Sequence, residues 1–274
     1  MNYDYAIHSD FLIHWTGIDI DRVYDQQWYQ SDKSETNKSC DVTGKYFKRL
    51  HDILQFGIWM TPENESTLCF NNTSINVPPT PRSCFTELKL SESRQHAQNY
   101  GRLGIGVKRP FVFNRLGRPV VYYGYHKDKI EDIFFEQCCK ELTDKKFLNF
   151  YKPMNSSKVL TYDLYRESEW RILYFEELLT QQLIIDPRDP KNTKEYEYYN
   201  KLTPIEQSKL KYLIPLNNWF SMIIYPSHDV GNKAQHDSTI RHAIEEIKSR
   251  HDRGNKIESN NWPIELYLDA CRNF

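Results

Sequence analysis

Short apolar runs of strand length recur along the chain and alternate with polar turns. The first, residues 10–17 (Asp-Phe-Leu-Ile-His-Trp-Thr-Gly), ends in a polar turn, as a buried strand does. Residues 169–175 alternate and then run apolar, which indicates a half-buried strand. On the same grounds we predict strands at residues 83–88, 104–107, 119–124, 183–185 and 219–226. A turn around 114–117 would join the strands at 104–107 and 119–124.

Apolar side chains at helical spacing predict amphipathic helices at residues 45–56, 128–147 and 236–250. Gly57 follows the first helix at the position of a C-terminal glycine, and Asp237 or Ser238 would cap the third. A shorter helix would begin at Ser91 or Ser93 and run through Gln98. The residues expected to face the core are Ile130, Ile133, Phe134, Cys138 and Leu142 in the second helix, and Ile240, Ile244 and Ile247 in the third.

Two polar stretches separate these elements. Residues 19–44 are predicted to form an inserted loop, and residues 61–82 a long loop, which in a compact domain is more often functional than idle. The order of strands and helices is mixed, with no internal repeat and no regular β-α-β alternation. We therefore predict one α+β domain over residues 1–274, with a mixed, mostly antiparallel sheet and flanking helices.

Composition narrows the classes of function. The chain has 274 residues, with 36 Lys+Arg against 37 Asp+Glu, and this near-neutral balance excludes whole-chain electrostatic attraction to nucleic acid or membrane. No apolar run approaches the roughly 20 residues of a spanning helix, and residues 1–5 lack a secretory pattern, which indicates a cytoplasmic protein. The six cysteines lack metal-ligand spacing, so we expect reduced thiols and no metal site.

The candidate chemistry is sparse. Glycines at residues 101–106 fit neither a Rossmann nor a P-loop pattern. His14 closes an apolar strand, where a core histidine bonded to a backbone carbonyl is the commoner case. Glu167 and Glu169, two residues apart on a strand, would share a face and raise each other's pKa unless a cation intervenes. Two interpretations are open. Arg166 and Arg171 could pair with the two glutamates in a structural ion-pair network, or one carboxylate lines a cleft, where it holds a sugar hydroxyl or polarises a nucleophile.

Several of these stretches resemble ADP-ribosyltransferases. Residues 11–16 and 50–57 are similar to the opening of those proteins, where a strand ends in His-x-Thr and a helix of the form Leu-x-x-Ile-Leu-x-x-Gly follows; DNA-modifying DarT toxins open similarly. Residues 83–86 and Tyr100 match the strand and stacking tyrosine that come next. Residues 167–169 match the late strand that begins with the catalytic glutamate. The resemblance implies an ADP-ribosyltransferase-like fold.

The resemblance also implies a mechanism with NAD as the substrate. Glu169 would stabilise the ribose cation as nicotinamide leaves, Glu167 would position or deprotonate the acceptor, and His14 would lie near the ribose. Tyr100 would stack nicotinamide, and Arg102, within a basic group with Lys108 and Arg109, would hold phosphate. The full set of implied cofactor-binding residues is Trp15, Thr16, Thr86, Tyr100, Arg102 and Arg171.

Most of the chain is also similar to the AbiGi-like abortive phage-resistance family, through residues 84–88, 96–106, 118–123, 261–264 and 268–271. Together the two resemblances imply a toxin or effector in antiphage defence that transfers ADP-ribose from NAD to DNA or RNA, or secondarily to protein. The alternative is a non-catalytic antitoxin or adaptor that binds a companion protein from the same operon. A metal-dependent nuclease built on Glu and His residues is a third hypothesis.

Overall fold

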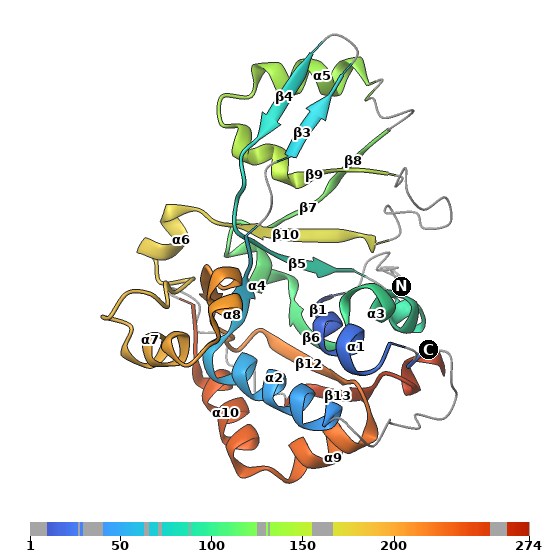
Figure 1. Ribbon diagram of the computed structural model, residues 1–274, viewed down its shortest axis with the longest axis vertical. Helices are drawn as coiled ribbons and strands as arrows, with labels where there is room; N and C mark the ends of the chain where they lie inside the picture. The colour runs from blue at the N-terminus through green and yellow to red at the C-terminus, as the bar shows by residue number, and fades with distance from the viewer. Residues whose placement is uncertain are drawn as a thin grey trace, which may run out of the picture. The chain divides into compact units, whose positions relative to one another are not determined.

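The structure is a computed structural model that describes residues 10–26, 28–29, 41–62, 66–70, 73–87, 89–124, 130, 132–154, 167–252 and 262–273. The chain divides into two compact units (Figure 1). Unit 1 comprises residues 1–58, 87–111 and 214–274, and unit 2 comprises residues 59–86 and 112–213. Each is described by itself, and the single domain expected from the sequence stays a prediction.

Unit 1 contains strands in the order β13 (Ile264–Tyr267), β12 (Phe220–Tyr225), β6 (Leu103–Lys108) and β1 (Phe11–Thr16). β6 is antiparallel to both β1 and β12, and β13 runs parallel to β12. Gly106 lets β6 approach β12 closely, because a Cβ on this residue would lie 2.6 Å from that of Met222. The predicted strands at 10–17, 104–107 and 219–226 are confirmed.

The helices of unit 1 are α1 (Ile18–Tyr24), α2 (Val42–Phe56), α3 (Ser93–Tyr100), α9 (His228–His236) and α10 (Ser238–Ser249), with short 3-10 turns at Leu90–Glu92 and Ala270–Asn273. α2 packs against α9 and α10. The Asp237 carboxylate caps α10 by accepting from the amides of Thr239 and Ile240, as expected. Gly57 ends α2 at φ 112°, and its amide donates to Ile53 O, so this prediction is also confirmed.

Unit 2 contains the antiparallel strand order β5 (Arg82–Thr86), β10 (Glu169–Leu173) and β7 (Arg118–Pro119). Two strand pairs accompany it: antiparallel β3 (Ser66–Cys69) with β4 (Ser74–Val77), and parallel β8 (Val121–Tyr123) with β9 (Tyr151–Pro153). β2 (Ile58–Met60) pairs with β11 (Tyr212–Ile214). The helices are α5 (Ile133–Glu141), a 3-10 helix at Lys145–Phe150, α6 (Glu176–Thr180), α7 (Thr193–Asn200) and α8 (Pro204–Lys209), while α4 (Arg109–Phe113) begins in unit 1.

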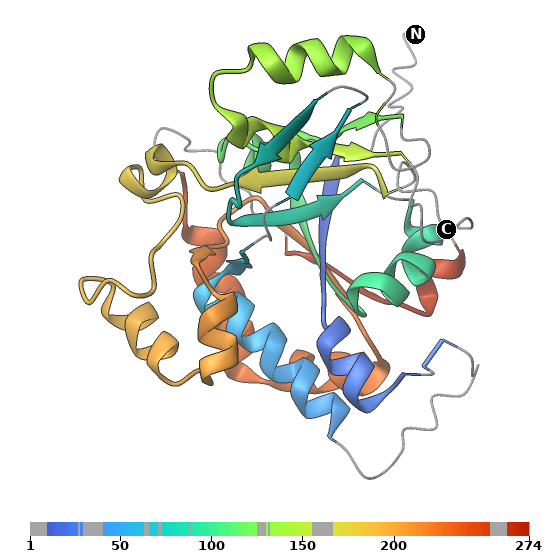
Figure 2. The same ribbon diagram turned by 45° about the horizontal axis from the view of Figure 1, so that its top comes forward.

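Helix α5 lies beside the β3–β4 and β8–β9 pairs (Figure 2). The cluster between them includes Val77, Tyr123, Phe135 and Cys139. The predicted face of this helix was wrong: Phe135 and Cys139 are buried, whereas Ile133 and Phe134 are exposed. The Asp132 carboxylate caps the helix by accepting from the Phe135 amide, and the ring of Phe135 stacks on Tyr123 and Tyr151, so this side of the helix faces the core. Ile130 lies before the helix and bridges to Phe70 instead.

Both predicted loops contain regular structure. α1 occupies residues 18–24 of the first, and α2 already begins at Val42, because Asp41 accepts a hydrogen bond from the Gly44 amide. The second contains the β3–β4 pair. Residues 183–185 form only a bridge from Ile185 to Leu213 rather than a strand. The turn at 114–116 follows α4 and does not join a hairpin, since β6 pairs with β1 and β12 while residues 118–119 pair with β10.

The α+β class, with a mostly antiparallel sheet and flanking helices, is confirmed. Within the described ranges, no helix combines the length and apolar character needed to cross a bilayer.

Candidate functional site

The acidic pair predicted from sequence lies in a buried ionic cluster of unit 2. We call Lys152, Glu167, Glu169 and Arg171 the Lys152 cluster. Lys152 Nζ lies 2.5 Å from Glu167 Oε2 and 2.8 Å from Glu169 Oε2. Arg171 Nε lies 2.7 Å from Glu169 Oε1, and its Nη1 donates to the Asn149 carbonyl. The ion-pair network considered from the sequence is therefore formed, with Arg171; Arg166 lies outside the described residues.

The backbone between the two glutamates explains their convergence. Glu169 is the first residue of β10, and Arg171 follows on the same side of the strand. Glu167 precedes the strand, and Ser168 between them has φ 43°, in the left-handed region that residues other than glycine rarely adopt. Both carboxylates reach Lys152 through this turn rather than through strand alternation. Tyr122 helps to fix the start of β10, because its hydroxyl accepts from the Glu169 amide at 3.1 Å.

Two carboxylates and two cations make the Lys152 cluster electrically balanced. Burial alone would raise the pKa of Glu169, but Arg171 and Lys152 outweigh burial and hold that pKa well below its usual range. Burial would lower the pKa of Lys152, but Glu169 and Glu167 raise it above the ordinary value. Burial, and then the charge of Glu169, raises the pKa of the Cys84 thiol to about 12. At neutral pH this arrangement is a set of fixed, mutually compensated charges.

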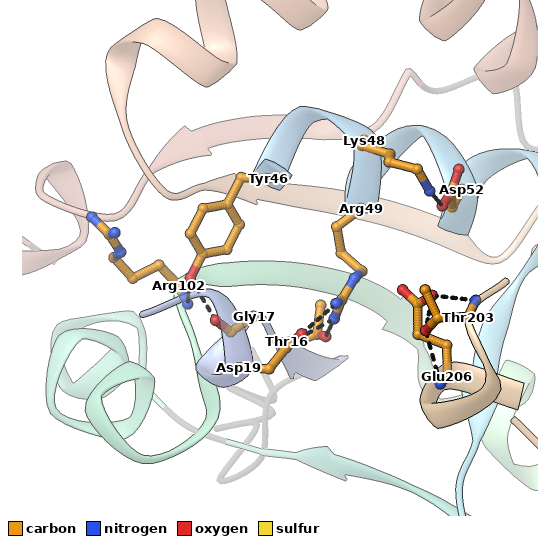
Figure 3. Close-up of polar contacts among 10 residues, drawn as sticks. All are labelled: Thr16, Gly17, Asp19, Tyr46, Lys48, Arg49, Asp52, Arg102, Thr203 and Glu206. Carbon is orange, nitrogen blue, oxygen red and sulfur yellow. Dashed lines mark hydrogen bonds and ion pairs between the residues drawn. The ribbon is translucent and has the colours of Figure 1, made fainter. Parts of the chain in front are cut away.

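A second buried ionic cluster lies in unit 1. We call Asp21, Asp25, Tyr46 and Arg102 the Arg102 cluster. Arg102 Nε lies 3.0 Å from Asp21 Oδ1, and its Nη2 lies 2.8 Å from Asp25 Oδ2. Figure 3 shows the Tyr46 hydroxyl between the backbones of Gly17 and Arg102, where it donates to Gly17 O and accepts from Arg102 N, both at 3.1 Å. Gly17 has φ 108°, and a Cβ there would lie 2.3 Å from the tyrosine ring.

This second cluster is unbalanced, since two carboxylates share one guanidinium. Asp21 is only 2% exposed, and its Oδ2 is buried without a hydrogen bond. Burial raises the pKa of Asp21, and Arg102 offsets that effect only in part. Burial, followed by the charge of Asp21, raises the pKa of Tyr46 well above its usual value, so the phenol stays protonated.

Two of the implied cofactor-binding residues are engaged within unit 1. Arg49 Nη1 donates to Thr16 Oγ1 at 3.0 Å, and its Nη2 lies 2.8 Å from Asp19 Oδ2 (Figure 3). Arg102 is held by its two aspartates. The basic group expected around Arg102 is not formed: Arg102 precedes β6 and Lys108 ends it, about 20 Å apart at the usual rise of a strand. Arg109 pairs with Glu87.

Of the remaining predicted residues, Trp15 and Thr86 are buried, whereas His14 and Tyr100 are half-buried. His14 lies opposite Ile105 in the β1–β6 ladder, and Trp15 packs with Trp28 and Ala97. Tyr100, implied to stack nicotinamide, is half-buried, and its ring stacks on that of His96 with a centroid distance of 4.5 Å. Thr86 is buried opposite Glu169 in the β5–β10 ladder.

The structure groups the predicted site residues by unit. Glu167, Glu169, Arg171 and Thr86 are in unit 2, whereas His14, Trp15, Thr16, Tyr100 and Arg102 are in unit 1. A single site made by both groups, and NAD as its ligand, stay predictions. Lys152 was missed, because nothing in its local sequence marks it as the partner of carboxylates 15 and 17 residues away. In the described parts of the chain, no three His, Cys, Asp or Glu side chains are grouped so as to hold a metal ion.

Comparison with known proteins gives one family. No curated protein and no solved structure matches the chain. Residues 56–224, which are 169 of the 274, match the family described as "Putative abortive phage resistance protein AbiGi, antitoxin". The hypothesis of an ADP-ribosyltransferase toxin was wrong, because the matching family is one of antitoxins and the DarT-like layout finds no support. The ADP-ribosyltransferase hypothesis depended on short motifs at strand ends, whereas the similarity to AbiGi proteins extends over most of the chain. This chain belongs to the AbiGi family of abortive phage-resistance proteins.

Proposed function

We propose that this protein is the antitoxin of an abortive-infection system and that it works without catalysis, by binding a companion toxin protein of the same system in the cytoplasm. One observation carries the proposal: the match to an antitoxin family over residues 56–224. That segment contains every described residue of unit 2, together with α3, β6 and all but the last residue of β12 in unit 1.

The Lys152 cluster supports the non-catalytic part of the proposal. A general acid or base works best with a pKa near the operating pH, and enzymes raise carboxylate pKa values to reach it. Glu169 departs in the opposite direction, because Arg171 and Lys152 stabilise its ionised form, and both of its carboxylate oxygens already accept hydrogen bonds from these two side chains. Both carboxylates are buried and paired, as expected of groups that hold β9 and β10 together rather than groups that turn over a substrate.

The experiment tests neutralisation and binding separately. The protein encoded beside this chain is produced in cells alone and together with the chain, while growth is followed. We expect growth arrest with the companion alone, recovery when the chain is present, and co-elution of the two purified proteins as one complex. Absence of recovery contradicts the antitoxin role, and recovery without a complex contradicts the binding mechanism.

A matched variant tests the absence of catalysis. Glu167→Gln leaves Lys152 paired with Glu169, so the fold retains its main contacts. At equal amounts of folded protein we expect this variant to restore growth as well as the wild type does. Loss of neutralisation by a folded Glu167→Gln protein would show that the carboxylate pair has a chemical role.

A further inference from the structure

Helix α5 of unit 2 carries the two most exposed large hydrophobic side chains of the described residues. Ile133 is 83% exposed and Phe134 is 80% exposed, and they are neighbours in the first turn. Single exposed apolar residues are ordinary, but adjacent large ones on a regular element are typical of an interaction surface. The helix lies within the segment that matches the antitoxin family.

The core of unit 2 does not need these two side chains. Phe135 fills the inward side of α5, where its ring stacks on Tyr123 and on Tyr151, each with a centroid distance of 4.7 Å. Cys139, one turn later, is also fully buried in this cluster. α5 therefore has a complete apolar face toward its own core and a second apolar pair that points away from it.

The charges around the exposed pair indicate what kind of surface would cover it. α5 and its cap contain Asp132, Glu136 and Glu141 against Lys140, a net charge of about −2 at neutral pH. Lys145 donates to the carbonyls of Cys139, Lys140 and Leu142 at the C-terminal end of the helix, whereas Ile133 and Phe134 are in its first turn. Lys140 Nζ is occupied by Glu136 Oε1 at 2.7 Å, and Gln137 donates to Glu141. An apolar contact bordered by acidic side chains is complemented by an apolar pocket bordered by basic ones.

We propose that the outward face of α5, centred on Ile133 and Phe134, is the docking surface for the companion toxin, and that the toxin contributes an apolar pocket with a basic rim. This inference rests on the proposed antitoxin function and locates its binding surface.

The test compares dissociation constants for the purified companion protein. Ile133→Ala combined with Phe134→Ala should weaken the complex roughly a hundredfold, and Phe134→Ala alone about tenfold or more, as expected of central apolar anchors. Because both side chains are exposed, the melting temperature of the free protein should stay close to the wild-type value. Ile205→Ala is the control, since Ile205 is also in the first turn of a helix of unit 2 and is 69% exposed. It should leave the dissociation constant unchanged.

The acidic border is tested by Glu141→Lys, which reverses one exposed charge. We expect severalfold weaker binding at low salt and a smaller difference at high salt, because salt screens exposed charges. A companion with an acidic rim would instead bind the variant more tightly, which would overturn the assignment of charge.

The outcomes separate this inference from the function on which it rests. If the companion binds wild type and the double variant equally, the α5 surface is wrong while the antitoxin proposal stands. If the wild type forms no complex, both are wrong. If the double variant changes the oligomeric state of the chain alone, a second copy of this chain occupies the face, and the proposal is overturned.

Discussion

The two units each contain a buried ionic cluster made from similar groups, yet the carboxylates respond in opposite directions. In the Lys152 cluster, two glutamates face two cations, and the pKa of Glu169 is well below its usual value. In the Arg102 cluster, two aspartates face one guanidinium, and the pKa of Asp21 is raised. Burial opposes ionisation in both, so the number of cations within contact decides the outcome.

The clusters also differ in how they are held together. In the Arg102 cluster a neutral hydroxyl links two backbone segments, because Tyr46 hydrogen-bonds to the backbones of Gly17 and Arg102. The Lys152 cluster has charged groups at its centre, and Lys152 is the element that joins the two glutamates. Loss of a carboxylate should therefore lower stability in unit 2, where it leaves a cation unpaired, and change it little in unit 1, where it removes excess negative charge.

The largest expected effect is at Lys152. Lys152→Met removes one cation and leaves Glu167 buried with a carboxylate neighbour, which should lower the free energy of unfolding by about 3–5 kcal/mol. Urea denaturation of the wild type and the variant measures this difference in the free energy of unfolding. Lys140→Met is the control, because it removes an exposed i,i+4 pair with Glu136 and should change stability by about 0.5 kcal/mol or less. Equal effects at the two positions would show that the Lys152 cluster contributes no more than a surface pair.

Neutralising one carboxylate in each cluster should change the free energy of unfolding by different amounts. Glu169→Gln leaves Arg171 without its partner carboxylate and should lower the free energy of unfolding by about 3 kcal/mol or more. Asp21→Asn should change it by about 1 kcal/mol or less in either direction, because Arg102 keeps Asp25 and the excess negative charge is removed. If Asp21→Asn were as destabilising as Glu169→Gln, charge balance would not be what separates the clusters.

The smallest effect is a difference in pH dependence. Glu169 has a lowered pKa when folded, so its stabilisation is present above the unfolded pKa of about 4.3 and is lost as the pH falls from there through the lower folded pKa. Asp21 has a raised pKa when folded, so the folded state binds its proton more readily, and this term gains stability as the pH falls from neutral. Unfolding of wild type and of Asp21→Asn is measured from pH 7 down to about pH 4, close to the unfolded pKa of an aspartate. The wild type should gain relative to the variant over that range, and parallel curves would contradict the raised pKa.

The sequence was sufficient for elements whose pattern and boundary signals agree. Strands β1 and β12 follow from their largely apolar runs, and β10 follows from alternation that ends in an apolar run. α10 follows from Asp237 with isoleucines at helical spacing. For α5, two apolar faces compete, and the choice between them depends on the rings of Tyr123 and Tyr151, which local sequence does not show.

The candidate site was predictable only in part. Glu167 and Glu169 are recognisable in the sequence as a close acidic pair, and the ion pair of Glu169 with Arg171 follows from the position of both residues on one face of β10. Lys152 is brought to them by β9, whose partner in the fold is β8, so its role depends on tertiary structure. Asp21 and Asp25 lie in a stretch polar enough to be taken for a loop, where α1 instead buries Asp21 against Arg102.

The central claim is that this chain neutralises its companion protein by binding it. The most direct test is a calorimetric titration of the purified companion protein with this chain. The account predicts a saturable, stoichiometric complex that releases no nicotinamide when NAD is added, and whose formation at matched concentrations accounts for the recovery of growth. Growth recovery by catalytic amounts of the chain, with no heat of binding, would contradict an antitoxin that acts by holding its partner.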